Sequence, residues 1–116
     1  MPRTRGFSDK KLRLRHWSDH GQDFATAITV AQYEAMADRF LSQALCPTMI
    51  PCNRKHGDHV RYDQATGTFG VLSADGIIRT YFKPVPCAWI PPAFVNPRWC
   101  HAHADNITYF RIECAK

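Results

Sequence analysis

The sequence has no long apolar run. Its apolar stretches, such as Ile77-Ile78 and Ala93-Phe94-Val95, are far shorter than the roughly 20 residues that a membrane-spanning helix needs. We therefore expect no transmembrane segment and no membrane partner. The basic N-terminus is followed by no apolar segment typical of a secretory signal peptide. The chain is expected to stay where it is made, or to be delivered as part of something larger.

Acidic residues are few and scattered. The 116-residue chain has 10 Asp and Glu residues against 15 Lys and Arg residues, which gives a net charge of +5. The carboxylates form no tight cluster of the kind that a two-metal nuclease uses. Asp58, Asp63 and Asp75 fall in or beside predicted turns, where Asp is common for local reasons. Asp75-Gly76 in particular predicts a tight hairpin turn.

Basic residues gather at the N-terminus, in and just after the segment 1–11. Six of them lie in the first fifteen positions with a single acidic residue, Asp9. They are Arg3, Arg5, Lys10, Lys11, Arg13 and Arg15. Such a stripe is expected of a protein that binds a phosphate backbone. An ordinary solvated surface would have the same composition.

The five cysteines form an odd set in a chain for which no signal peptide is predicted. They are Cys46, Cys52, Cys87, Cys100 and Cys114. Their number favours reduced thiols over a disulfide framework. The CxxC spacing of zinc knuckles is absent. A small zinc-stabilised domain built on Cys100, His101, His103 and an upstream cysteine stays open as an alternative.

Hydrophobic periodicity predicts helices first and strands afterwards. A short helix is expected over 10–21, and a second begins after Thr29, which can form a capping box with Gln32. After Pro47 the period changes to two, which predicts strands at 48–53, 59–63, 69–72 and 77–83. The chain is therefore expected to be one α+β domain, with N-terminal helices on one face of a four-stranded antiparallel meander.

The C-terminal third has a different character. Five prolines between positions 84 and 97 exclude a long helix there. We expect 84–105 to be an ordered loop that packs its aromatic rings on the body of the domain. Residues 107–114 have a strand-like character and are expected to add a fifth strand at an edge of the sheet.

Cations alternate along two of the predicted strands. In 77–83 the apolar positions should face the helices, which leaves Arg79, Tyr81 and Lys83 on the open face. The helix-facing set is then Ile78, Thr80 and Phe82. In 59–63, His59 and Arg61 alternate in the same way. This open face predicts an RNA-binding platform, because cations bind phosphates and aromatic rings stack on bases.

RNA cleavage without a metal needs a base for the 2′-hydroxyl, an acid for the leaving 5′-oxygen and cations for the transition state. Histidine suits the first two roles because its pKa lies near neutrality. His16 and His20 are four residues apart on one face of the predicted helix, beside Arg15. An ordinary histidine pair at a helix end would have the same spacing. Arginine suits the third role, because its planar fork meets two phosphate oxygens.

Four segments, taken in order, resemble a known family: HWSDHGQDF, YEAMADRFL, GDHVRYDQATGTFGVLSADGIIRTYFKP and YFRIECAK. They are similar to ribonuclease domains at the C-termini of bacterial polymorphic toxins, including contact-dependent inhibition proteins. These domains belong to the barnase, EndoU, colicin and RelE-like superfamily. The resemblance covers roughly residues 12–83, with a weaker similarity at 109–116. It implies a compact α+β fold that cuts RNA, often tRNA, with no metal or other cofactor.

The resemblance also implies roles for individual residues. His20 matches a histidine of the N-terminal helical region, with His16 as its rival, and acts as general base or acid. Thr80 in IIRTYFKP matches a Ser or Thr that positions or bonds the phosphate. Arg61 and Arg79 match basic residues that bind the scissile phosphate. Because strand alternation separates Thr80 from Arg79, the active face of the sheet stays open.

The family resemblance has further implications. The products are expected to carry a 2′,3′-cyclic phosphate. Action in the bacterial cytoplasm, delivery as the C-terminal part of a larger secreted toxin and neutralisation by an acidic immunity protein are implied, and the chain is expected to be a monomer. The proline-rich segment after Pro84 and the extra cysteines depart from the family pattern. A module that binds RNA through the same basic face without cutting it is the other alternative.

Overall fold

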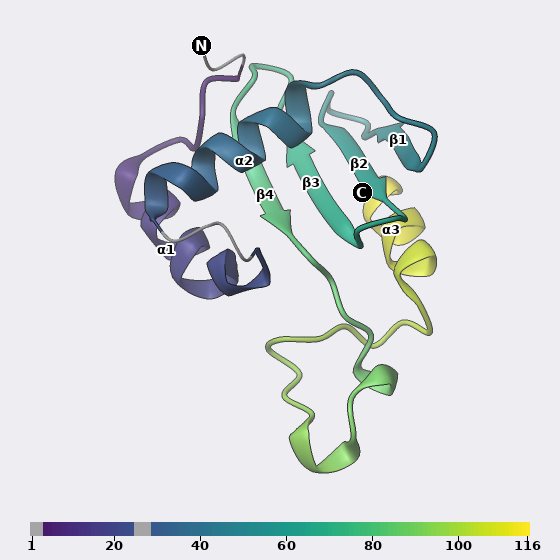
Figure 1. Ribbon diagram of the computed structural model, residues 1–116. Helices are drawn as coiled ribbons and strands as arrows, with labels where there is room; N and C mark the ends of the chain where they lie inside the picture. Colours follow the sequence, from purple (N-terminus) through teal and green to yellow (C-terminus); the bar gives the residue numbers. More distant parts are fainter. Residues whose placement is uncertain (1–3, 25–28) are drawn as a thin grey trace.

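The computed structural model describes residues 4–24 and 29–116, so Arg3 of the predicted basic segment lies outside the described residues. N-terminal helices are followed by a four-stranded antiparallel sheet and a C-terminal helix (Figure 1). The predicted α+β fold and the meander are confirmed. None of the helices in the described part of the chain has the length and apolar character needed to span a membrane.

The two N-terminal helices begin at local capping signals. Helix α1, Lys10–His20, follows Asp9, whose carboxylate accepts a hydrogen bond from the Leu12 N–H at 2.7 Å. Helix α2, Val30–Ser42, begins with the predicted capping box. The Thr29 hydroxyl accepts from the Gln32 N–H at 3.1 Å, and the Gln32 side chain accepts from the Thr29 N–H at 2.9 Å.

The sheet consists of β1 Met49–Asn53, β2 His59–Asp63, β3 Thr68–Leu72 and β4 Ile78–Phe82. The strands lie in the order β1-β2-β3-β4, each antiparallel to the next, so β1 and β4 are the edges. The Asp75-Gly76 turn predicted between β3 and β4 is present, and Gly76 has a φ of 85°. All four predicted strands are confirmed within one or two residues at their ends.

One face of the sheet packs against α1 and α2. Its core contains Tyr33, Phe40 and Leu41 from α2, together with Ile78 and Tyr81 from β4. Gly70 in β3 permits the close approach of α2, because a Cβ atom there would lie 2.9 Å from a Leu41 methyl carbon.

The other face is covered by helix α3, Asn106–Cys114. Phe110 of α3 packs with a second buried cluster on the sheet, formed by Val60, Tyr62, Phe69 and Val71. Helices therefore lie on both faces of the sheet, and not on one face only as expected.

A β-bulge in β4 reverses the expected alternation. Val71 pairs with Thr80 and Leu72 pairs with Ile78, so Arg79 is the extra residue. Beyond the bulge, Tyr81 turns into the α2 core and is only 4% exposed, while Thr80 and Phe82 point to the side of α3. The prediction that Arg79, Tyr81 and Lys83 share an open face is therefore wrong.

The expected fifth strand is also wrong, because residues 106–114 form α3. Asp105 caps this helix by accepting a hydrogen bond from the Thr108 N–H at 2.7 Å. Ile107 and Phe110 are three residues apart, which puts both side chains against the second cluster. This helical spacing favours a helix over a strand.

Two disulfides overturn the expectation of reduced thiols. Cys52–Cys114 joins β1 to α3, and Cys87–Cys100 closes the base of the loop after β4. Cys46 is exposed and free. Because Cys100 is bonded to Cys87, its sulfur is not free to bind zinc as the alternative interpretation required. Among residues 4–24 and 29–116, no group of three His, Cys, Asp or Glu residues is placed to hold a metal ion.

Candidate active site

A cleft of about 460 Å³ opens beside the end of the edge strand β4. Its walls come from the end of α1, the residues after β4, the returning half of the loop 84–105 and α3. The side chains that carry chemistry there are His20, Lys83, Arg98, His101 and Tyr109. A cleft of this size with a few convergent polar groups is typical of a ligand-binding site.

His20 enters the cleft from the last turn of α1. Its ring packs on Phe82 with the centroids 4.9 Å apart, and the Trp99 ring lies edge-on at 6.4 Å. Within the described residues, no hydrogen bond engages either ring nitrogen of His20. Burial lowers the pKa of this imidazole, and the opposing attraction of Asp23 and Asp19 is weaker. His20 is therefore neutral near pH 7 and has a nitrogen available to accept a proton.

Lys83 and Asp23 connect the helical N-terminal region to the end of β4. The Lys83 N–H donates to an Asp23 carboxylate oxygen at 3.2 Å, which ties the 3₁₀ turn Gly21–Asp23 to the strand. The Lys83 ammonium lies 5.3 Å from the centroid of the Phe24 ring. Burial raises the pKa of Asp23. Lys83 therefore lines the same cleft as His20, with its main chain fixed by Asp23.

His101 is a second imidazole in the cleft, held in a fixed orientation. Its Nε2 lies 2.8 Å from the Asn106 side-chain oxygen, and its Nδ1 accepts from the His103 N–H at 3.3 Å. Since Nδ1 accepts, Nε2 carries the proton and donates to Asn106. The ring stacks on Tyr109 at 4.6 Å. Burial raises the pKa of Tyr109, so its phenol stays protonated and can donate.

Arg98 completes the cationic side of the cleft. Its guanidinium lies 5.0 Å from the centroid of the exposed Trp99 ring. The cleft therefore combines two cations, two imidazoles and a phenol with the carboxylates of Asp19 and Asp23. Such groups can transfer protons and stabilise a phosphate in a charged transition state.

Thr80 lies next to the cleft but does not line it. It is half-buried and shares a sheet face with Phe82, two residues further along β4. His20, which contacts Phe82, thus reaches round the β4 edge to the side on which Thr80 lies.

His16 lies in a separate hollow of about 430 Å³, together with Arg79. Its ring stacks on Phe7 with the centroids 5.1 Å apart, and its buried Nδ1 has no hydrogen-bond partner among the described residues. Burial lowers the pKa of His16, and the neighbouring His20 contributes further. His16 is thus part of the packing beneath α1 and does not line the cleft that holds His20.

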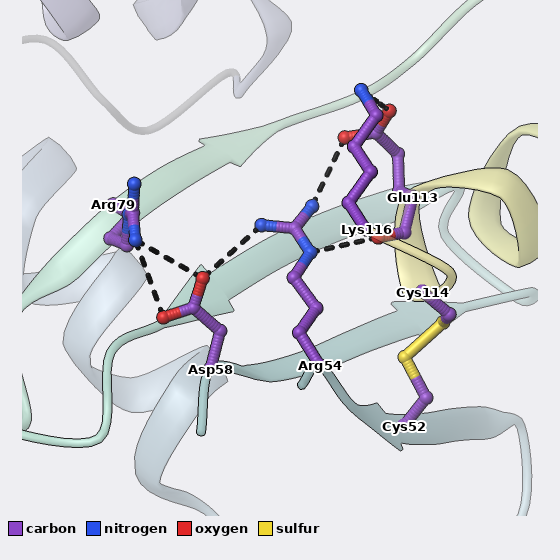
Figure 2. Close-up of polar contacts among 7 residues, drawn as sticks. All are labelled: Cys52, Arg54, Asp58, Arg79, Glu113, Cys114 and Lys116. Carbon is purple, nitrogen blue, oxygen red and sulfur yellow. Dashed lines mark hydrogen bonds and ion pairs between the residues drawn. A yellow bond between two sulfur atoms is a disulfide. The ribbon is translucent and has the colours of Figure 1, made fainter. Parts of the chain in front are cut away.

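Arg79 belongs to an ion-pair network at the opposite end of β4 (Figure 2). Its guanidinium lies 3.1 Å from the Asp58 carboxylate, which also pairs with Arg54 at 3.4 Å. Arg54 continues the network to α3, where it pairs with Glu113 at 3.1 Å, and Lys116 pairs with the same carboxylate. This network connects the β1-β2 turn to α3, close to the Cys52–Cys114 disulfide.

The remaining predicted site residues lie elsewhere. Arg61 donates to the carbonyl oxygens of Phe40 and Gln43 at 2.9 and 2.8 Å, so it caps the end of α2. Burial lowers the pKa of Arg61. Tyr81 is a core residue, and its carbonyl accepts a hydrogen bond from the Tyr33 hydroxyl. His59 is exposed, and its Nδ1 lies 2.8 Å from the Asn53 side-chain oxygen. Arg15 on α1 is also exposed, and both residues lie outside the cleft.

The sequence predicted His20 and Lys83 as site residues, and both line this cleft. It did not predict the opposite wall, which is formed by the returning loop and α3. Arg98 and Tyr109 were not candidates, and His101 was considered only as a metal ligand. The Cys87–Cys100 disulfide holds the returning side of the loop, which carries Arg98 and His101, next to the residues that follow β4. The cluster of Cys100, His101 and His103, interpreted as a possible zinc site, was the signal in the sequence that lay on this wall.

The fold and the cleft define an α+β domain with an available imidazole at the edge of its sheet. No protein-family model matches the chain, and no curated protein matches it. The functional assignment therefore depends on the groups in the cleft.

Proposed function

We propose that this protein is a metal-independent endoribonuclease that cleaves RNA, with tRNA as the expected substrate. One observation carries the proposal: His20 lines the same cleft as the cations Lys83 and Arg98. Neither ring nitrogen of His20 has a hydrogen bond to another described residue. A neutral imidazole beside two cations suits phosphodiester cleavage, because a proton must be removed while negative charge develops on the phosphate.

In the proposed reaction, His20 accepts the proton of the 2′-hydroxyl, and the 2′-oxygen attacks the adjacent phosphorus. Lys83 and Arg98 stabilise the charge on the phosphorane. The bond from phosphorus to the 5′-oxygen breaks, and the Tyr109 hydroxyl donates its proton to the leaving oxygen. The His20 imidazolium then returns the proton it accepted to the Tyr109 phenolate through solvent. The products are a 2′,3′-cyclic phosphate and a 5′-hydroxyl.

The proposal revises the roles expected from the resemblance. Thr80 is assigned no contact with the phosphate, because it does not line the cleft, although it shares a sheet face with Phe82. Arg61 is reassigned to the end of α2, where both its hydrogen bonds are to main-chain carbonyls. Arg79 is reassigned to the Asp58 ion pair. Both reassignments leave Lys83 and Arg98 as the cations of the site.

The same proposal includes a toxin role, with delivery as the C-terminal part of a larger protein and a monomeric active form in the bacterial cytoplasm. The two disulfides support passage through an oxidising compartment, where such bonds form and persist. The net charge of +5 favours an acidic immunity protein as the neutralising partner. Arrested growth of bacteria that express the chain, relieved by co-expression of that partner, is the expected result.

Incubation of the purified chain with total tRNA in EDTA tests the enzymatic proposal. Discrete fragments that end in a 2′,3′-cyclic phosphate are expected. Fragments that end in a 3′-hydroxyl would contradict the proposed attack by the 2′-oxygen. RNA that stays intact but is bound in a salt-dependent manner would favour the binding module without catalysis.

A further inference from the structure

A loop of residues 84–105, which we call the aromatic arm, extends away from the sheet between β4 and α3 (Figure 1). The sequence predicted that its rings pack on the body of the domain, and this is wrong. Trp89 is 61% exposed, Phe94 is 76% exposed and Trp99 is 44% exposed. Three large rings in water on one short segment are unusual for a surface without a binding role.

The aromatic arm has a closed and ordered base. The Cys87–Cys100 disulfide joins its two sides, and two main-chain hydrogen bonds join His101 to Cys87 and Val85 at 2.8 and 3.0 Å. Two 3₁₀ turns, Cys87–Trp89 and Pro92–Phe94, carry Trp89 and Phe94. Five prolines restrict the backbone further. The rings are therefore presented by a pre-ordered segment, which lowers the entropy lost when a partner binds.

The aromatic arm is continuous with the proposed active site. Its returning side supplies Arg98, Trp99 and His101 to the cleft that contains His20. Trp99 lines the cleft and is also partly exposed, with the Arg98 guanidinium 5.0 Å from the centroid of its ring. An Arg stacked on an exposed ring is common where a protein binds single-stranded nucleic acid.

The charge of the aromatic arm fits the same partner. Residues 84–104 contain no Asp or Glu, while Arg98 and two histidines lie on the returning side. A phosphate backbone that follows this segment therefore meets no carboxylate of the arm before Asp105, although the cleft itself contains the carboxylates of Asp19 and Asp23. Exposed rings on a segment that carries a cation and has no acid of its own before Asp105 favour a partner with flat faces and negative charge, which describes an unpaired stretch of RNA.

We propose that the aromatic arm is a base-stacking platform for single-stranded RNA next to the cleavage cleft, with Trp89, Phe94 and Trp99 as the stacking rings. The inference rests on the proposed ribonuclease function and extends it. It assigns the substrate class as RNA with unpaired bases beside the scissile phosphate. Stacking on aromatic rings accepts every base, so the platform sets affinity for unpaired RNA and leaves sequence preference to the cleft.

Binding is tested with the 116-residue chain carrying His20→Ala, so that the RNA is not consumed. The probe is a fluorescein-labelled oligouridine of about 12 nucleotides, a length within the range that one binding domain covers. An abasic oligonucleotide of equal length has the same phosphates without bases. The test variant is Trp89→Ala with Phe94→Ala, and Leu45→Ala, an exposed apolar position outside the aromatic arm, is the matched control.

The double substitution is expected to raise the Kd for oligouridine at least tenfold and to leave the Kd for the abasic strand within about twofold. Leu45→Ala should change neither. An unchanged Kd for oligouridine would overturn the inference, and so would an equal loss for both strands. A dimer of the wild-type chain that separates in the double variant, with RNA binding unchanged, would assign the rings to a second copy instead.

Cleavage distinguishes failure of this inference from failure of the proposed function. If the aromatic arm alone is misassigned, the double variant still cuts tRNA at the wild-type rate, and the cut still depends on His20. If the wild-type chain does not cut RNA yet loses oligouridine affinity on the double substitution, the ribonuclease proposal fails and the stacking platform stands.

Discussion

The imidazole of His20 packs on the ring of Phe82, with the two centroids 4.9 Å apart. His20 ends α1, which lies on one side of the sheet, whereas Phe82 points from the edge strand β4 to the side of α3. The contact brings the helix end round the edge of the sheet. The candidate site therefore lies at this edge, where α1, β4, the aromatic arm and α3 meet, and not on either broad face.

The rate of RNA cleavage should depend on pH through His20. Burial lowers its pKa below the ordinary value of 6.5, so the neutral base is the main form at pH 7. We expect kcat/KM to rise with pH below that pKa and to level off by about pH 7. Single-turnover rates across this range test the expectation. A rate that continued to rise above about pH 8 would assign the role of base to another group.

Arg61→Ala should affect stability and spare catalysis. Its guanidinium donates two hydrogen bonds to carbonyl oxygens at the end of α2. Arg61 is only partly buried, so water replaces part of the contribution of about 1.5 to 3 kcal/mol that a bond from a charged donor makes. We expect the free energy of unfolding to fall by about 2 kcal/mol, with kcat/KM of the folded protein unchanged within a factor of about three. Denaturant unfolding and cleavage rates measure the two effects. A large loss of activity at full stability would restore Arg61 as a phosphate ligand.

Loss of the disulfide between β1 and α3 should weaken the fold. Cys52 and Cys114 are 62 residues apart, and closing a loop of that length stabilises a fold by about 4 kcal/mol in the chain-entropy account. Cys52→Ser is expected to lower the free energy of unfolding by about 2 to 5 kcal/mol. Cys46→Ser, at the exposed free thiol, is the control and should leave it unchanged. Equal stability of the two variants would contradict the disulfide.

His16 should make the fold less stable in mild acid. Its pKa is lowered in the folded protein, so the unfolded chain binds a proton more readily. The stabilisation from neutral His16 is complete above the ordinary pKa of 6.5 and is lost as the pH falls through the folded pKa. His16→Phe keeps a ring against Phe7 and removes the proton site, so its unfolding free energy should fall less between about pH 7.5 and pH 5. A decline as steep as in the wild type would contradict this role.

Much of the fold was predictable because its signals are local. The Thr29 capping box and the Asp75-Gly76 turn act over four residues or fewer, and both predicted their elements correctly. The bulge at Arg79 depends on how β4 pairs with β3, which the alternation of one strand does not record. That single extra residue moved Tyr81 into the core and Thr80 to the side of α3. The prediction of which side chains share a face of β4 was therefore wrong because that face depends on the pairing between two strands.

The site was predictable on one side only. His20 and Lys83 follow from the spacing of histidines and from the end of a predicted strand. The opposite wall depends on the Cys87–Cys100 disulfide and on α3, and the pairing of cysteines does not follow from their spacing. His101 and Tyr109 meet only because the loop returns over α3. These contacts join distant parts of the chain, so the sequence pattern gave no direct signal for them.

The most direct test of the account is the single-turnover rate of tRNA cleavage in EDTA by the wild-type chain, His20→Ala and His59→Ala. His59 is exposed and lies outside the cleft, so its loss controls for a change in imidazole content. We predict that His20→Ala lowers the rate by about 10² to 10⁴ without unfolding the domain, whereas His59→Ala leaves it within about threefold. Equal rates for wild type and His20→Ala would contradict the central claim and remove this imidazole from the mechanism.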